Sequence, residues 1–253
     1  FCFFAKNSTK SIYYYFRKRR SYSWIKNILN IYKSYYVFGQ TIIDKIAISS
    51  GLRNKFTYHS DGVELIEKIL QEKKGGVLIS AHVGNFEIAE YFLNELEENV
   101  SIRVLTTDTE HSDIKDYIES VTTKSSIKFI IIKDDLSHIF EINAALARNE
   151  IICMTGDRYV NETKSLTHTL LGKEAKFPAG PFLLGSRLKV PVIFVYVMKE
   201  TSKHYHLYAR TTKGKHRDPN ALLKSYIESL EWMLEKYPLQ WFNYFNFWND
   251  LKD

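Results

Sequence analysis

A histidine and a glutamate five positions apart are the residues whose chemistry stands out first. His82 follows an apolar run, residues 77–81, and Glu87 lies beyond a Gly-Asn dipeptide. At helical pitch, five residues turn the chain by about 500°, so a single helix would hold the two side chains apart. If a strand ends at the histidine and Asn85 caps a helix that contains Glu87, the turn between them can bring imidazole and carboxylate together.

A histidine held by a carboxylate can act as a general base. The carboxylate fixes the tautomer of the ring and stabilises the imidazolium that forms when the ring takes up a proton. Glu87 would stay ionised near a helix N-terminus, because the helix dipole favours negative charge there. The alternative is a buried histidine bonded to backbone, with Glu87 a favourable first-turn acid. The pair alone does not decide between these two interpretations.

Motifs for covalent, metal or nucleotide chemistry are absent from the sequence. There is no GxSxG, and neither Cys2 nor Cys153 is close to His82 in sequence, so an acyl-enzyme is not indicated. The histidines form no HExxH and the cysteines no CxxC, and two such distant cysteines fit a reducing compartment. GxxxxGK[ST] and GxGxxG are missing too. The sequence therefore predicts no metal and no nucleotide cofactor.

Asp157 and Arg158 follow a later apolar run, residues 151–155. In an open parallel sheet, functional groups collect beyond the carboxyl ends of the strands, where Thr107 and Asp108 are also expected. A guanidinium at such an end can bind phosphate or carboxylate oxygens through two parallel hydrogen bonds, and Asp157 could lock it in place. A surface ion pair is the alternative interpretation.

Short apolar runs that alternate with helical segments must position these residues. This alternation is typical of parallel βαβ units, and continuous apolar strands fit a sheet covered on both faces. We therefore predict an α/β fold, a mostly parallel central sheet flanked by helices, with an N-terminal helical extension. Residues 1–74 would form the basic aromatic helical region and 75–253 the core. Predicted strands are 77–81, 102–107, 127–132, 151–155, 191–198 and 205–211, with a hairpin over 165–178; predicted helices are 24–48, 61–73, 85–97, 112–122, 136–148, 180–188 and 220–236.

The positive charge of the chain is concentrated at its beginning. The formal net charge is +6, yet no acidic residue precedes Asp44, whereas eight Lys and Arg residues do. Aromatic residues such as Tyr14, Tyr22 and Trp24 are interleaved with them, a combination that the headgroup region of an anionic membrane favours. We prefer a membrane-docking arm. A nucleic-acid-binding arm and a solvated helical face are the alternatives.

The remaining composition is that of an ordinary globular protein. The chain has 253 residues, of which 45% are hydrophobic and 25% charged, enough to bury a substantial core. No uninterrupted apolar run approaches the roughly 20 residues that cross a bilayer. The chain begins at Phe1 rather than Met, so we expect it to be a fragment.

Four sequence blocks in order resemble the lysophospholipid acyltransferase superfamily, most of all its lipid A biosynthesis acyltransferase branch. The blocks lie within residues 75–196, and the tail YPLQWFNYFNFW adds further likeness. His82 and Glu87 fit the H-x4-[DE] motif of that family, and Arg158 fits its arginine-bearing second block. The third and fourth blocks correspond to Phe177-Pro178-Ala179-Gly180 and Val190-Pro191-Val192.

The third block departs from the pattern of glycerophosphate-type members. Those members usually read FPEGTR, whereas this chain reads FPAGPF, with Ala179 and Phe182 in place of the acid and the arginine. The resemblance therefore implies a sugar- or amino-acid-based lipid acceptor in preference to lysophosphatidic acid. Members of the lipid A branch usually carry an N-terminal hydrophobic anchor, and we hypothesise that such a segment is missing before Phe1.

The mechanism implied by the resemblance is direct acyl transfer. His82, oriented by Glu87, would remove the proton from an acceptor hydroxyl or amine as it attacks the thioester of acyl carrier protein or coenzyme A. No further cofactor, metal or nucleic acid would take part. The expected location is the cytoplasmic face of the bacterial inner membrane. Expected substrate-binding residues are Asn85 in the turn, Asp157 and Arg158 for an anionic group, and Phe177, Pro178 and Gly180 around the acceptor or acyl pocket.

Two other functions stay open at the level of sequence. A hydrolase could use the same dyad to activate water on a lipid ester or thioester. A non-catalytic membrane or nucleic-acid binder would owe its affinity to the residues before Asp44 and would not depend on His82.

Overall fold

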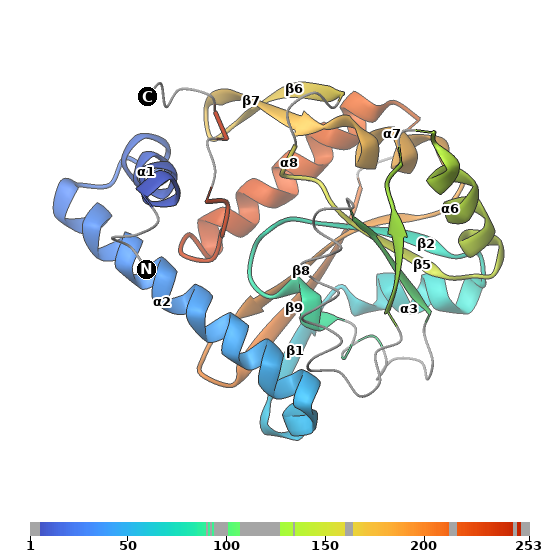
Figure 1. Cartoon of the computed structure of the whole chain (residues 1–253), viewed down its shortest axis with the longest axis horizontal. Coiled ribbons are helices and arrows are strands. Elements are labelled where there is room, and N and C mark those ends of the chain that lie inside the picture. Colours follow the sequence, from blue (N-terminus) through green and yellow to red (C-terminus); the bar gives the residue numbers. More distant parts are fainter. Residues whose placement is uncertain are drawn as a thin grey trace.

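The central element is a seven-stranded sheet with the order β1-β9-β8-β2-β5-β3-β4 (Figure 1). The computed structural model describes residues 6–89, 91, 93, 101–106, 127–133, 135–159, 164–212, 217–244 and 247–248. Neighbouring strands run parallel except β8 and β9, which are antiparallel. The strands are β1 (Thr57–Asp61), β2 (Gly76–Ser80), β3 (Ile102–Thr106), β4 (Ile127–Ile131), β5 (Ile151–Thr155), β8 (Val192–Lys199) and β9 (His204–Thr211).

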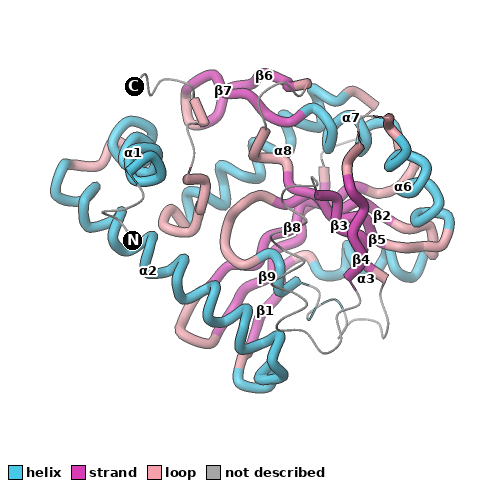
Figure 2. The backbone as a smooth tube through the Cα atoms, in the orientation of Figure 1, coloured by secondary structure: helices cyan, strands magenta, loops and turns pink. Residues whose placement is uncertain are grey.

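Six α-helices of the described chain accompany the sheet, and a separate two-stranded hairpin lies beside it (Figure 2). The predicted α/β class, with a mostly parallel sheet and an N-terminal helical region, is confirmed. The predicted helix 112–122 and the candidates Thr107 and Asp108 lie outside the described residues. The helices are α1 (Lys6–Tyr14), α2 (Trp24–Ala47), α3 (Val63–Glu72), α6 (Ser137–Ala147), α7 (Ala179–Arg187) and α8 (Pro219–Lys236), and the hairpin strands are β6 (Ser165–Leu170) and β7 (Lys173–Pro178).

Strand β2 lies in the middle of the sheet and is buried along its whole length. Val77 and Ile79 pack into one hydrophobic cluster together with residues of α8, whereas Leu78 packs into a second cluster with Ile66 and Ile69 of α3. Because successive side chains of a strand point to opposite faces, a strand covered on both faces must be apolar throughout. This explains the continuous apolar run before His82.

Strand β1 was missed by the sequence analysis. Its residues alternate between exposed and partly buried, and its sequence, TYHSD, is largely polar. It pairs only with β9 in the described sheet, so it is an edge strand, and an edge strand needs little apolar surface. The apolar pattern that reveals a central strand is therefore absent.

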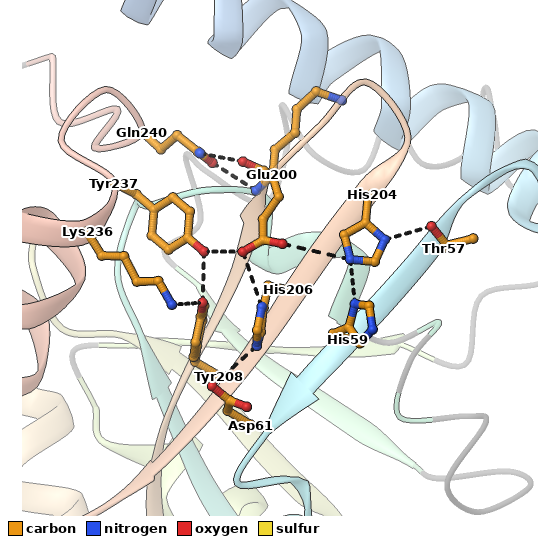
Figure 3. Close-up of polar contacts among 11 residues, drawn as sticks. Thr57, His59, Asp61, Glu200, His204, His206, Tyr208, Lys236, Tyr237 and Gln240 are labelled. Atoms are coloured by element: carbon orange, nitrogen blue, oxygen red, sulfur yellow. Dashed lines mark hydrogen bonds and ion pairs between the residues drawn. The ribbon is translucent and has the colours of Figure 1, made fainter.

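A polar cluster joins this edge to the segment after α8 (Figure 3). His59 Nδ1 lies 2.7 Å from His204 Nε2, which links β1 to β9. His206 Nδ1 lies 3.2 Å from Glu200 Oε1, the same oxygen that accepts a 2.7 Å hydrogen bond from the Tyr237 hydroxyl. The cluster therefore holds together three segments that are distant in sequence.

A buried carboxylate fastens β3 to the start of β5. Glu150 is 7% exposed and accepts hydrogen bonds from Arg103 Nε at 2.5 Å and from Arg148 Nε at 2.8 Å. Burial by itself would raise the pKa of Glu150. The two guanidinium groups lower this pKa by more than burial raises it, so the net result is a lowered pKa. The carboxylate is therefore ionised at neutral pH and accepts hydrogen bonds from both arginines.

We expect Glu150→Gln to lower the free energy of unfolding by about 1 to 2 kcal/mol, because it weakens two charge-assisted hydrogen bonds in a partly dry site. Urea denaturation at pH 7 measures the effect. Glu141→Gln is the matched control, since Glu141 is exposed on α6 and its replacement should change the stability by less than about 0.5 kcal/mol. Equal effects of the two substitutions would contradict the assigned role of Glu150.

Candidate active site

The His82 segment, residues 82–85, follows β2 and is hydrogen-bonded to the C-terminal part of the chain. His82 O accepts a 2.8 Å hydrogen bond from Phe242 N, and Gly84 N donates a 2.9 Å hydrogen bond to Gln240 O. Val83 forms an isolated bridge with Trp241 between these two contacts. The backbone of the His82 segment is thus part of a short pairing with residues 240–242.

Glycine is required at position 84 for the segment to lie this close to β8. Gly84 has φ +59°, and a Cβ added there would lie 2.1 Å from the carbonyl oxygen of Val197. The next residue, Asn85, donates its backbone N–H to the same oxygen at 2.7 Å. A side chain at position 84 would therefore displace the segment from the end of β8.

His82 is held by Asp157 rather than by a residue of its own segment. Its Nδ1 lies 2.8 Å from Asp157 Oδ1, and its backbone N–H donates to Oδ2 at 3.0 Å. Trp241 Nε1 donates to the same Oδ2 at 3.1 Å. With Nδ1 bonded to a carboxylate, Nε2 is the ring nitrogen that can take a proton from a substrate.

The burial of the two side chains differs in a way that suits a base and its support. Asp157 is fully buried, whereas 23% of the His82 side chain is exposed. Burial would raise the pKa of Asp157, but the charge of the His82 imidazolium and the hydrogen bonds from His82 and Trp241 lower it, with a lowered pKa as the outcome. Asp157 is therefore ionised at neutral pH and can stabilise a positive charge on His82.

The turn after β5 is fixed by close packing. A Cβ on Gly156 would lie 3.0 Å from ring atoms of both Phe182 and Tyr226. Gly156 N and the Tyr226 hydroxyl both donate to Ser80 O, at 2.9 and 3.0 Å. These contacts connect the turn of Asp157 to the last residue of β2, just before His82.

Asn85 and Asp157 make contacts other than those the sequence suggested. Asn85 forms no cap hydrogen bond to the short helix that follows, so the predicted cap was wrong. Its side chain is buried and donates to Thr41 O of α2 at 3.0 Å, because α2 lies against it. Asp157 was expected to lock Arg158 in place; in the structure its carboxylate is hydrogen-bonded to His82 and Trp241.

The other candidate residues lie on separate segments of the chain. Glu87 lies in the 3₁₀-helix Phe86–Ile88, and its side chain is outside the described part of the chain, so the His82–Glu87 pair stays a prediction. Arg158 Nη2 donates to Phe242 O at 3.4 Å. The remaining candidates lie around the start of α7: Phe177 is fully buried, Pro178 is half-buried and Gly180 is exposed.

Asp157 as the partner of His82, and Trp241 as a donor to Asp157, were missed by the sequence analysis. The two residues have equal offsets from their strands, but this becomes a signal only once β2 and β5 are known to be neighbours. Ser80 and Thr155 are paired in the parallel register of β2 and β5, and His82 and Asp157 each lie two positions further on. Within the described residues, no group of three or more His, Cys, Asp or Glu side chains is arranged to hold a metal ion.

We expect Asp157→Asn to destabilise the protein at neutral pH and to reduce its sensitivity to acid. The pKa of Asp157 is lower in the folded chain than the roughly 3.9 of an unfolded aspartate, so the ionised carboxylate stabilises the fold above that pH. This contribution is lost as the pH falls through the folded pKa. Urea denaturation at pH 7 and below pH 4, with ¹⁵N NMR of the His82 ring, measures both effects. An unchanged pH dependence and an unchanged tautomer would contradict the assignment.

A comparison with models of protein families gives a match. The model of a family described as bacterial lipid A biosynthesis acyltransferase matches residues 30–249, a range that includes His82, Asp157 and Trp241. The search of curated proteins found no match. Since the family model covers most of the chain, the protein belongs to the bacterial lipid A biosynthesis acyltransferase family and is an acyltransferase.

Proposed function

We propose that the protein transfers a fatty acyl group from an acyl thioester to a hydroxyl or amine of a membrane lipid or glycolipid, with His82 as the general base. Acyl carrier protein or coenzyme A would supply the thioester. Membership of the family supports acyl transfer. The observation that carries the mechanism is the 2.8 Å contact between His82 Nδ1 and the buried carboxylate of Asp157.

In the proposed reaction, Nε2 of His82 takes the proton of the acceptor hydroxyl or amine as its oxygen or nitrogen attacks the thioester carbonyl. The tetrahedral intermediate collapses, a new ester or amide bond forms and the carbon–sulfur bond breaks. The proton then passes from the imidazolium to the leaving thiolate. Asp157 stabilises the imidazolium between the two proton transfers. The acceptor itself is the nucleophile, so no acyl-enzyme is required.

The third block supports an acceptor other than lysophosphatidic acid. Ala179 and Phe182 stand where glycerophosphate-type members carry an acid and an arginine, and both are buried in the structure. Apolar side chains that pack into a core cannot bind a phosphate. We therefore assign recognition of an anionic part of a substrate to Arg158, and we assign the shape of the acceptor or acyl pocket to the region of Phe177, Pro178 and Gly180.

The outer side of α2 supports docking on a membrane. Ile25, Leu29, Tyr32, Tyr36 and Ile43 follow one another at spacings of three, four or seven residues, and each is more than half exposed. An exposed apolar stripe of this length marks an interaction surface. The residues before Asp44 include eight basic and no acidic side chains, and an anionic bilayer would attract this positive charge. We propose the cytoplasmic face of a bacterial inner membrane, where acyl thioesters are accessible.

None of the helices formed by the described residues combines the length and the apolar content that a bilayer crossing requires.

We expect His82→Gln to reduce acyl transfer by roughly 10²- to 10⁴-fold, because the acceptor would lose its general base. Purified protein, an acyl thioester and a glycolipid acceptor are incubated, and the acylated product is quantified by mass spectrometry. His168→Gln is the matched control, since His168 lies in the β6–β7 hairpin and contacts the carbonyl of Thr169. Near-normal transfer by a folded His82→Gln protein would end the proposed mechanism.

The same assay separates the competing functions. A hydrolase releases free fatty acid without an acceptor, whereas a transferase needs the acceptor lipid. Comparison of Asp157→Asn with Glu87→Gln decides which carboxylate supports His82. If Asp157 is the support, its substitution causes the larger fall in turnover, and a dominant effect of Glu87→Gln would restore the pairing expected from the H-x4-[DE] motif.

We expect the triple variant Ile25→Ser/Leu29→Ser/Ile43→Ser to bind anionic vesicles at least about tenfold more weakly, because each large apolar side chain contributes on the order of 1.5 to 3 kcal/mol when fully buried. Sedimentation with vesicles of phosphatidylglycerol and phosphatidylethanolamine measures binding. Phe140→Ser is the control, since Phe140 is 79% exposed on α6. Unchanged vesicle binding with a changed oligomeric state would assign the stripe to a second copy of the chain.

A further inference from the structure

A buried ion pair lies where α2 meets the end of β8, and the proposed chemistry does not use it. Lys199 Nζ donates to Asp44 Oδ2, and the two side chains are only 5% and 11% exposed. The hydroxyl of Tyr205, which is itself fully buried, donates to the same carboxylate oxygen. Burial and the neighbouring carboxylate raise the pKa of Tyr205, so it remains a donor.

An ion pair at this position is not required for stability alone. The removal of two charges from water is costly, and apolar side chains of similar volume often stabilise a fold equally well. The pair here is nevertheless well satisfied, since Lys199 Nζ also donates to Ser202 O at 2.7 Å. Directional contacts of this kind fix one arrangement of the segments that they join.

One connection leads from Lys199 to the His82 segment. Lys199 N donates to Gln240 Oε1 at 3.0 Å, and Gln240 Nε2 donates back to Lys199 O at 2.7 Å. Figure 3 shows these two bonds of Gln240 with the end of β8. The carbonyl of Gln240 then accepts the N–H of Gly84, two residues after His82. Lys199 is thus linked to the backbone beside His82 through the hydrogen bonds of Gln240.

A second connection leads from α2 itself. Asn85 Nδ2 donates to Thr41 O, one helical turn before Asp44. The ring of Phe38, a further turn back, packs against Phe242 with 5.0 Å between centroids, and Phe242 N donates to His82 O. The side of α2 opposite its exposed stripe therefore contacts the His82 segment directly at Asn85 and indirectly through Phe242.

We propose that Asp44 is a positioning residue for acyl transfer. Its pairing with Lys199 clamps α2 to β8, so that the helix proposed to dock on the membrane and the segment of His82 move as one unit. Docking of α2 then places the imidazole at the membrane surface in a single geometry. This inference rests on the proposed function, because it assigns a role within the same reaction.

The test replaces both charges at once. Asp44→Leu/Lys199→Met leaves no unpaired buried charge, so the variant should keep its fold, as judged by circular dichroism and thermal unfolding. With anionic vesicles that contain the acceptor, we expect kcat to fall by roughly 10- to 100-fold, because small displacements of a base are costly. KM for the acyl thioester should change by less than about threefold, and vesicle binding should be unchanged.

The matched control is a second ion pair that also connects the N-terminal region to the core. Arg20 Nη1 lies 2.7 Å from Glu235 Oε2 of α8, and neither residue has a described contact with the His82 segment. Arg20→Met/Glu235→Leu should leave kcat within about twofold of wild type. Asp44→Asn, which can still accept from Lys199 and Tyr205, should recover most of the lost kcat.

Distinct outcomes separate the two proposals. A wild-type kcat in the folded Asp44→Leu/Lys199→Met protein would overturn the positioning role, as would an equal loss in the control pair. If that double variant does not fold, Tyr205→Phe replaces it: a fall of several-fold in kcat with an unchanged KM supports the role, and an unchanged kcat overturns it. Failure of the wild-type protein to transfer an acyl group would instead refute the proposed function.

Discussion

The contact between His82 and Asp157 depends on the register of two neighbouring parallel strands. Ser80 of β2 is paired with Thr155 of β5, and each functional residue lies two positions beyond its strand. A shift of the register by one residue would carry the imidazole away from the carboxylate, because side-chain direction alternates along a strand. The apolar side chains of β2 and β5 hold this register, since β2 is buried along its whole length and β5 at Ile151, Ile152 and Met154.

The negative charge of a fully buried carboxylate must be stabilised by hydrogen-bond donors close to it. Asp157 meets this requirement through three donors, namely His82 Nδ1, His82 N and Trp241 Nε1. One of these donors comes from the C-terminal segment, which also pairs with the backbone on both sides of Val83. The aromatic tail of the chain is therefore part of the active-site framework rather than a peripheral extension. Burial and hydrogen bonding together hold Asp157 in its ionised form.

The arrangement suits direct transfer better than covalent catalysis. Asp157 holds the imidazole from within the core, and in the proposed mechanism the partly exposed ring of His82 offers its second nitrogen to an incoming acceptor. The helix with the exposed apolar stripe, α2, accepts a hydrogen bond from Asn85 at Thr41 O, and its Phe38 packs against Phe242, whose N–H donates to His82 O. Helix α2 thus connects the surface proposed to face the membrane with the segment that carries His82.

Local patterns in the sequence were sufficient for most elements of the fold, whereas the partnership at the active site required the tertiary structure. Helix α2, the β6–β7 hairpin and the strands β8 and β9 were predicted because periodicity and turn residues act over a few positions. The edge strand β1 carries no such pattern. The sequence also placed His82 and Asp157 at strand ends, but the adjacency of β2 and β5 is non-local and no spacing reveals it. Asn85 illustrates the same limit. Asparagine is a favoured helix-capping residue, but α2 packs against this side chain, which donates its hydrogen bond to a carbonyl of α2 instead.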